Sequence, residues 1–216
     1  MLELWLVRHG QTQFSRENRF CGSIDPPLSE VGERMAQALG AAHGESKWDA
    51  IYCSPSTRAQ QTVAPLARRA GLTPVLIEGL REISYGEWEG LKHEEAKAQF
   101  PAIYEYWAQD TASRATPGGE TAFMVAGRAA PVVERIRREH QDGRVLIVSH
   151  KATLRILVCA LLGMDVRLFR DRIAQPVCAL SRFEIRTQKN GASGAMLTML
   201  GDVSHLPVEL REAEGT

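Results

Sequence analysis

The chain has 216 residues, of which 44% are hydrophobic and 24% are charged. This composition is typical of a folded soluble domain and excludes disorder as the main state. Its 26 lysines and arginines balance its 26 aspartates and glutamates, so we expect no nucleic acid and no anionic membrane to be held by bulk charge. An anionic ligand would need a local cluster of cations.

The cysteines and the apolar runs favour a cytoplasmic protein. The four cysteines form no CxxC pair and lack metal-ligand spacing, so we expect thiols in a reducing compartment. The acidic start at residues 1–4 is not typical of a signal peptide. The longest apolar run, Leu157 to Leu162, is too short to span a membrane.

Predicted strands and helices alternate along the chain. Short apolar runs predict strands at residues 2–7, 50–53, 74–77, 145–148, 178–185 and 195–200. Apolar residues at helical spacing predict helices at residues 31–42, 59–70, 121–136 and 151–162. We expect Ser29 to cap the first helix, Pro65 to disturb the second, and Lys189-Asn190-Gly191 to form a turn between the last two strands.

An excursion interrupts this alternation between Glu78 and Glu120. Aromatic residues crowd it, and we expect Trp88 and Trp107 to pack rather than to stack on a ligand. The whole pattern predicts an α/β fold, a three-layer sandwich with a mostly parallel central sheet and helices on both faces. We expect a single domain over residues 1–216, with a small helical insertion or lid at about 83–117.

Cationic and imidazole side chains follow the predicted strands, at the sheet edge where α/β proteins bind ligands. Arg8 and His9 follow the first strand, Arg58 lies just past the second, and His150 ends a later one. The first pair alone is equally compatible with a surface turn. If the four side chains converge, they suit a tetrahedral oxyanion such as phosphate, and one imidazole can attack phosphorus. Glu82, after the third strand, is the best carboxylate to protonate a leaving alkoxide.

The segment Leu6-Val7-Arg8-His9-Gly10-Gln11-Thr12 resembles the signature of the histidine phosphatase superfamily, in the branch that includes the cofactor-dependent phosphoglycerate mutases. Further motifs of that branch follow in order: Arg19-Phe20-Cys21-Gly22, Asp25-Pro26-Pro27-Leu28-Ser29, Ser54-Pro55-Ser56-Thr57-Arg58-Ala59-Gln60-Gln61-Thr62, the set Glu82, Gly86, Trp88, Glu89 and Gly90, and Val148-Ser149-His150. The match covers about residues 3 to 205, and five motifs in the right order make it specific. It implies a phosphoglycerate mutase-like fold for the predicted sandwich.

The resemblance also implies a role for each matching position. His9 would be the phosphorylated nucleophile, and Glu82 would protonate the leaving group and later activate water. The phosphoryl group would be bound by the side chains of Arg8, Arg58 and His150 and approached by the backbone amides of Cys21, Gly22 and Lys151. This scheme needs no metal and no cofactor.

Some positions depart from the family pattern or lie outside it. Ser15 stands where the family usually has an asparagine that contacts phosphate. Lys151 replaces a small residue, and its side chain either supplies a cation for a substrate carboxylate or second phosphate or points to solvent. Cys21 stands where many relatives have Gln or Thr, and we expect a small half-buried thiol. Tyr85, three residues after Glu82, is equally compatible with substrate contact and with packing.

The preferred hypothesis is a metal-independent phosphomonoesterase that acts on a small phosphorylated metabolite through a phosphohistidine. The alternative is a cofactor-dependent phosphoglycerate mutase, but relatives with that activity have a longer insertion with an arginine pair and a lysine near the position of His93. A phosphate-binding module without turnover is disfavoured because His9 and Glu82 are both present. Relatives are often dimers, so the resemblance is also compatible with a homodimer.

Overall fold

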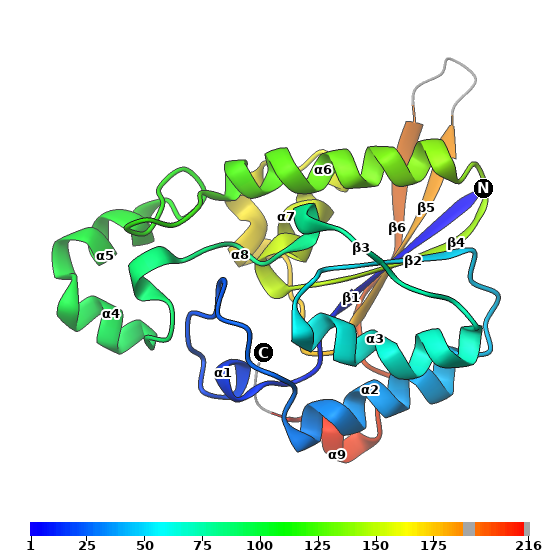
Figure 1. Cartoon of the computed structure of the whole chain (residues 1–216). Coiled ribbons are helices and arrows are strands. Elements are labelled where there is room, and N and C mark those ends of the chain that lie inside the picture. The colour runs from blue at the N-terminus through cyan, green and yellow to red at the C-terminus, as the bar shows by residue number, and fades with distance from the viewer. Residues whose placement is uncertain (188–192, 214–216) are drawn as a thin grey trace.

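A twisted sheet forms the centre of the molecule (Figure 1). The structure is a computed structural model and describes residues 1–187 and 193–213. Within these residues the strands are β1 Leu2–Arg8, β2 Ala50–Cys53, β3 Val75–Leu76, β4 Gly143–Ser149, β5 Leu180–Thr187 and β6 Ser193–Asp202. They lie in the order β3-β2-β4-β1-β5-β6. The first four of these are mutually parallel, and β5 pairs antiparallel with both β1 and β6, so the predicted mostly parallel sheet is confirmed.

Helices cover both faces of this sheet. The long helices are α2 Glu30–His43, α3 Thr57–Ala70, α6 Ala122–Glu139 and α7 Lys151–Leu162. The first two pack on one face and the last two on the other. Alternate residues of β1 enter the two cores: Trp5 and Val7 join the α2–α3 side, whereas Leu4 and Leu6 join the α6–α7 side. The predicted three layers therefore follow from strands that are apolar on both faces.

The excursion between β3 and α6 forms a small unit beside the main layers (Figure 1). Its helices are α4 His93–Gln99 and α5 Pro101–Gln109, with single 3₁₀ turns η1 Glu78–Leu80 and η2 Gly86–Trp88. The short helices elsewhere in the described residues are α1 Gln13–Arg16, α8 Phe169–Arg172 and α9 Val208–Arg211, with the 3₁₀ turn η3 Val166–Leu168. A separate aromatic core of Phe20, Trp88 and Trp107 packs under α4 and α5. Trp88 is fully buried and stacks on Tyr104, so its predicted packing role is confirmed.

Two local predictions have different outcomes. The Ser29 hydroxyl accepts a 3.1 Å hydrogen bond from the Gly32 amide and caps α2, as predicted. In contrast, α3 continues unbroken through Pro65, so the predicted disturbance is wrong. Pro65 packs closely on α2, where a Cβ at Gly40 would lie only 2.7 Å from the proline Cβ. The predicted turn at Lys189-Asn190-Gly191 lies outside the described residues.

Two predictions about solubility and thiols can also be compared with the structure. Among the helices of the described residues, none combines the length and the apolar character that a membrane crossing requires. All four cysteines are unpaired thiols, with Cys21 half-buried and Cys53, Cys159 and Cys178 buried.

Candidate active site

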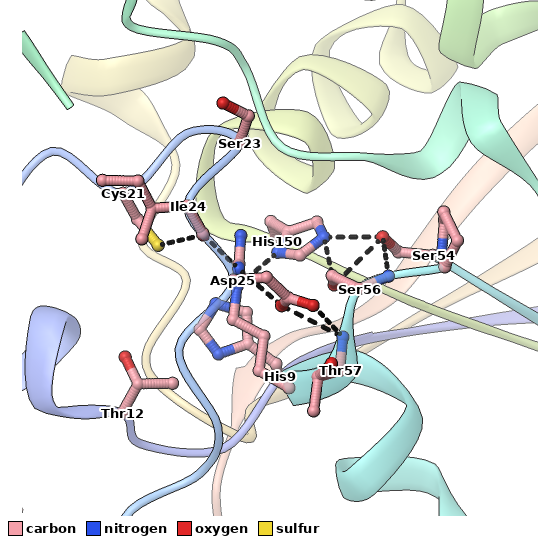
Figure 2. Close-up of polar contacts among 12 residues, drawn as sticks. His9, Thr12, Cys21, Ser23, Ile24, Asp25, Ser54, Ser56, Thr57 and His150 are labelled. Carbon is pink, nitrogen blue, oxygen red and sulfur yellow. Dashed lines mark hydrogen bonds and ion pairs between the residues drawn. The ribbon is translucent and has the colours of Figure 1, made fainter.

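The ends of β1 and β4 bring His9 and His150 together. These strands are parallel neighbours with Arg8 opposite Ser149, and the His9 amide donates to the Ser149 carbonyl at 3.0 Å. The two imidazole rings lie close to each other (Figure 2), and their centres are 5.2 Å apart. The predicted convergence of these side chains therefore follows from strand pairing.

The His9 ring is held in one tautomer. Its Nδ1 lies 2.8 Å from the Gly10 carbonyl, which can only accept, so Nδ1 carries the proton. Burial, followed by the charges of Arg58 and Arg8, holds the pKa of His9 well below its usual value. The ring is therefore neutral near pH 7. Its Nε2 keeps an unprotonated lone pair and has no hydrogen-bond partner among the described residues.

Both ring nitrogens of His150 have protein partners. Arg58 Nε donates to His150 Nδ1 at 3.2 Å, so the ring proton is on Nε2. That Nε2 lies 2.8 Å from Ser54 Oγ and 3.2 Å from Ser56 Oγ (Figure 2). Burial and the nearby Arg58 charge lower the pKa of His150 well below its usual value, so this ring is also neutral.

The two arginines are buried in different surroundings. Arg8 Nη1 donates to the Gln175 carbonyl at 2.7 Å, and its buried Nε has no partner among the described residues. Burial, opposed by Glu82, lowers the pKa of Arg8 to about 10, so it remains charged at neutral pH. Arg58 instead donates to the carbonyls of Gly22 at 3.2 Å and Ile24 at 2.9 Å. The hydrogen-bond donors Nη1 and Nη2 of the Arg58 guanidinium are therefore taken up by the loop at residues 22–25.

Glu82 lies against the N-terminus of α7. Its carboxylate accepts hydrogen bonds from the amides of Ala152 and Thr153, both at 3.2 Å, and from the Ile83 amide at 2.9 Å. These donors include helix N-terminal amides that favour an anion. An acid–base group is thus fixed beside the helix that follows His150.

Two neighbouring cavities contain all the side chains that the sequence singled out. A cavity of about 110 Å³ is lined, among others, by Arg8, His9, Ser15, Cys21, Glu82, Tyr85 and Lys151. A second, of about 630 Å³, is lined by Gly22, Arg58, Glu82 and His150 with ten further residues. Glu82 borders both cavities. The predicted residues are therefore brought to one end of the sheet, with His9 lining the smaller cavity and Arg58 and His150 lining the larger one.

Several predicted residues have structural contacts of their own. Ser15 Oγ accepts from the Thr12 amide at 2.9 Å and helps to cap α1, while its side chain borders the smaller cavity. Cys21 Sγ donates to the Ile24 carbonyl at 3.3 Å, and burial raises the pKa of this thiol to about 11. Tyr85 packs on the Phe20 ring at 4.8 Å. Lys151 is half-buried at the cavity rather than directed to open solvent.

Residues that the sequence interpretation missed also line the smaller cavity. They are Arg155, Arg170 and His93. His93 is half-buried in the insertion, and its ring centre lies 4.3 Å from that of Phe20. Arg155 follows Lys151 by four residues on α7, so helical periodicity could have placed both on one face. No local signal links Arg170 to them, since it comes from α8.

Glu89 holds the loop in place, a role that the motif match did not reveal. Its carboxylate accepts from Ser23 N at 2.9 Å, Ser23 Oγ at 2.5 Å and Tyr85 N at 3.1 Å. Although burial raises the pKa of Glu89, these hydrogen bonds lower it overall. Gly22 sits against the same carboxylate with φ of +54°, so a larger residue would both clash and strain the backbone.

We expect Glu89→Gln to loosen this loop. The new amide group would face backbone donors, and losing two hydrogen bonds to a carboxylate should lower the free energy of unfolding by about 1–3 kcal/mol. Hydrogen–deuterium exchange over residues 21–25 should become faster. Glu87→Gln, an exposed neighbour in the same segment, is the matched control. Unchanged exchange in Glu89→Gln would contradict the role of this carboxylate.

Five histidines make stability depend on pH. Burial holds the pKa of His9 and His150 well below the usual value, brings that of His93 and His205 to about 4, and lowers that of His43. Histidines in the unfolded chain have a pKa of about 6.5. Below that pH, the unfolded chain therefore binds more protons than the folded chain. The free energy of unfolding should therefore fall as the pH drops from 7.5 to 5.5. Urea denaturation at both pH values measures this, and equal midpoints would refute it.

The geometry of the site suits phosphoryl chemistry. Among the side chains that the structure describes, no group of three or more His, Cys, Asp or Glu residues is placed to hold a metal ion. The site instead combines a neutral imidazole with an open Nε2, buried guanidinium groups and a nearby carboxylate. These groups can attack phosphorus, stabilise the negative charge that develops, and move a proton.

Known proteins resemble this chain over most of its length. Residues 4–194 match the model of the histidine phosphatase superfamily (branch 1). Phosphoserine phosphatase 1 of Hydrogenobacter thermophilus is 32% identical over 169 residues, which cover 78% of this chain and 80% of that protein. The "Probable phosphoglycerate mutase GpmB" of Erwinia tasmaniensis is 30% identical over 206 residues, 95% of both chains. A structure of mycobacterial glucosyl-3-phosphoglycerate phosphatase with VO3 superposes with a TM-score of 0.83 at 26% identity, covering 92% of this chain and 98% of that one.

The family match, the sheet order and the placement of His9 and His150 at adjacent strand ends agree with one another. The chain belongs to the histidine phosphatase superfamily, branch 1.

Proposed function

We propose that this protein is a phosphomonoesterase that hydrolyses a small phosphorylated metabolite through a phosphohistidine at His9. The state of the His9 ring supports this most strongly. The ring is neutral, its Nδ1–H is held by the Gly10 carbonyl, and its Nε2 is open in a residue that borders a cavity with Arg8 and Glu82. This is the arrangement that an attacking imidazole requires.

In the first step, His9 Nε2 attacks the phosphorus atom and the bond from phosphorus to the alcohol oxygen breaks. Glu82, in its acid form, gives a proton to that oxygen, and the alcohol leaves. Arg8 stabilises the charge on the phosphoryl oxygens. Arg58 joins it when phosphate oxygens replace the Gly22 and Ile24 carbonyls and the Asp25 carboxylate that it now contacts.

In the second step, the Glu82 carboxylate takes a proton from water, and the resulting hydroxide attacks phosphorus. The bond between phosphorus and Nε2 breaks, inorganic phosphate leaves, and neutral His9 is restored. Throughout, the Gly10 carbonyl holds the Nδ1 proton and stabilises the positive charge that the phosphorylated ring carries. These steps use only the chain's own residues and water, so the proposal needs no metal and no cofactor.

We propose that one domain spans the chain, with residues 83–117 as the wall that selects the alcohol. The aromatic core under α4 and α5 reaches the smaller cavity through Phe20, Tyr85 and His93. The His9 cavity is small, about 110 Å³, which favours a small metabolite over a protein substrate. The relatives named as phosphoserine phosphatase and glucosyl-3-phosphoglycerate phosphatase support the same class of substrate, a small phosphorylated metabolite.

A phosphoglycerate mutase remains the second candidate because the 30% identical relative extends over 95% of this chain and is named as one. In a mutase, a substrate hydroxyl rather than water takes the phosphoryl group back. Release of inorganic phosphate without stimulation by 2,3-bisphosphoglycerate supports the phosphatase. Strict dependence on that compound supports the mutase.

The proposal is tested by trapping the intermediate. Protein mixed with a ³²P-labelled monoester, quenched within milliseconds and digested at alkaline pH should carry label on the peptide that contains His9. A chase with excess unlabelled ester should remove this label at the rate of turnover. Label on serine or cysteine, or no label during measurable turnover, would overturn the proposal.

A further inference from the structure

Three cations besides Arg8 and Arg19 line the His9 cavity. Lys151 and Arg155 lie one turn apart on α7, and Arg170 reaches the same cavity from α8. All three are half-buried. Because the chain carries equal numbers of cations and anions overall, this concentration of positive charge is local.

These cations lack anionic partners. Over residues 1–187 and 193–213, none of the three forms an ion pair within 4 Å. Arg155 Nε is buried without a hydrogen-bond partner there, and Arg170 lies over the Trp107 ring at 4.7 Å. Glu82 is the acidic side chain that borders the cavity, and its carboxylate is held by the amides of α7. Partly buried like charges without counterions are costly, so the arrangement favours an incoming anion.

The transferred phosphoryl group does not account for this cluster. That group must sit at His9 Nε2, where Arg8 is available to bind it. A step of four residues along α7 advances about 6 Å, so Arg155 lies one helical turn beyond Lys151, away from the end that follows His150. A second anionic group of a short substrate matches this spacing.

We propose that Lys151, Arg155 and Arg170 bind a second anionic group, a carboxylate or a phosphate, on the alcohol part of the substrate. This inference rests on the proposed phosphatase function and narrows its substrate class to short phosphorylated acids or bisphosphates. Arginine forks suit either group because both present two oxygens in one plane.

The ionisation of Lys151 agrees with this assignment. Burial, together with the positive charges of Arg8, Arg155 and Arg170, lowers the pKa of Lys151 to about 7, against an opposing effect of Glu82. A bound anion would raise that pKa and keep the ammonium charged. The lysine therefore gains its full charge when the second anion is present.

Matched substrates test the proposal. Phosphate release from 3-phosphoglycerate is compared with release from glycerol 3-phosphate, which has a hydroxymethyl group in place of the carboxylate. Propane-1,3-diol bisphosphate is compared in the same way with its monophosphate. In one of the two pairs, we expect kcat/KM to be at least tenfold higher for the substrate that carries a second anionic group. The pair that shows this difference identifies that group as a carboxylate or a phosphate. Equal values within both pairs would overturn the inference.

Substitutions of the arginines test which side chains cause the substrate preference. Arg155→Gln and Arg170→Gln should each reduce the kcat/KM preference for the substrate with two anionic groups about tenfold. Arg155→Lys should retain part of this preference. Arg172→Gln, an exposed arginine of the same short helix α8, is the matched control and should keep the preference. A preference that survives both glutamine variants would show that other groups bind the second anion, against the proposal.

A binding measurement separates this inference from the proposed reaction. In the His9→Ala variant, calorimetry should show that the ligand with two anionic groups binds at least tenfold more tightly than its matched partner with one. If the wild-type protein releases phosphate but shows no preference, the second anion is refuted and the phosphatase proposal stands. If no ester is hydrolysed, the phosphatase proposal fails, and this binding difference alone decides the inference.

Discussion

His9→Ala should lower kcat/KM for any phosphate monoester by at least about 10⁴-fold. The variant removes the atom that would bond to phosphorus, and losing a covalent catalyst costs several kcal/mol of transition-state stabilisation. Phosphate release measured under single-turnover and steady-state conditions gives the size of the loss. Retention of more than about a tenth of the wild-type rate would show that His9 is not the nucleophile.

The same variant should remain folded. The His9 side chain follows the last residue of β1, and among the described residues its ring makes one hydrogen bond, to the Gly10 carbonyl. Its removal should therefore lower the free energy of unfolding by only about 1 kcal/mol. Circular dichroism and urea denaturation check this. His140→Ala, at the end of α6 and outside both cavities, is a control that should keep full activity.

Glu82→Gln should separate substrates by the acidity of their leaving groups. An alkyl alcohol cannot leave without a proton, so its phosphorylation step should slow by about 10²–10⁴-fold. A p-nitrophenolate leaves readily as an anion, so its phosphorylation step should be much less affected. The glutamine oxygen can still accept from the Thr153 and Ile83 amides, whereas the hydrogen bond from the Ala152 amide to Glu82 Oε2 is lost.

The second step gives this variant a further signature. Without a carboxylate to activate water, the phosphohistidine should accumulate, and p-nitrophenyl phosphate should show a burst of about one p-nitrophenolate per active site before slow turnover. Stopped-flow absorbance measures the burst, and Glu87→Gln is the exposed control from the same segment. Equal losses for both leaving groups without a burst would contradict the role of Glu82.

The sequence already determined the layers of the fold and the end of the sheet that holds the candidate site. Apolar runs and helical spacing depend on which face of each element is buried, and burial is a local property of the side-chain pattern. His9 and His150 could be placed for the same reason, because each directly follows a buried strand and parallel strands end at one edge. Pro65 shows the limit of this reasoning, since α3 continues through it while it packs on α2.

Only the tertiary structure decided how the site is divided and which charges complete it. Arg58 reaches the loop carbonyls of Gly22 and Ile24, and Arg170 joins Lys151 from a separate helix. Such contacts depend on distances between segments far apart in the chain, which no local periodicity encodes. The net charge of zero likewise gave no sign of unpaired cations, because a sum over the whole chain carries no information about where each charge lies.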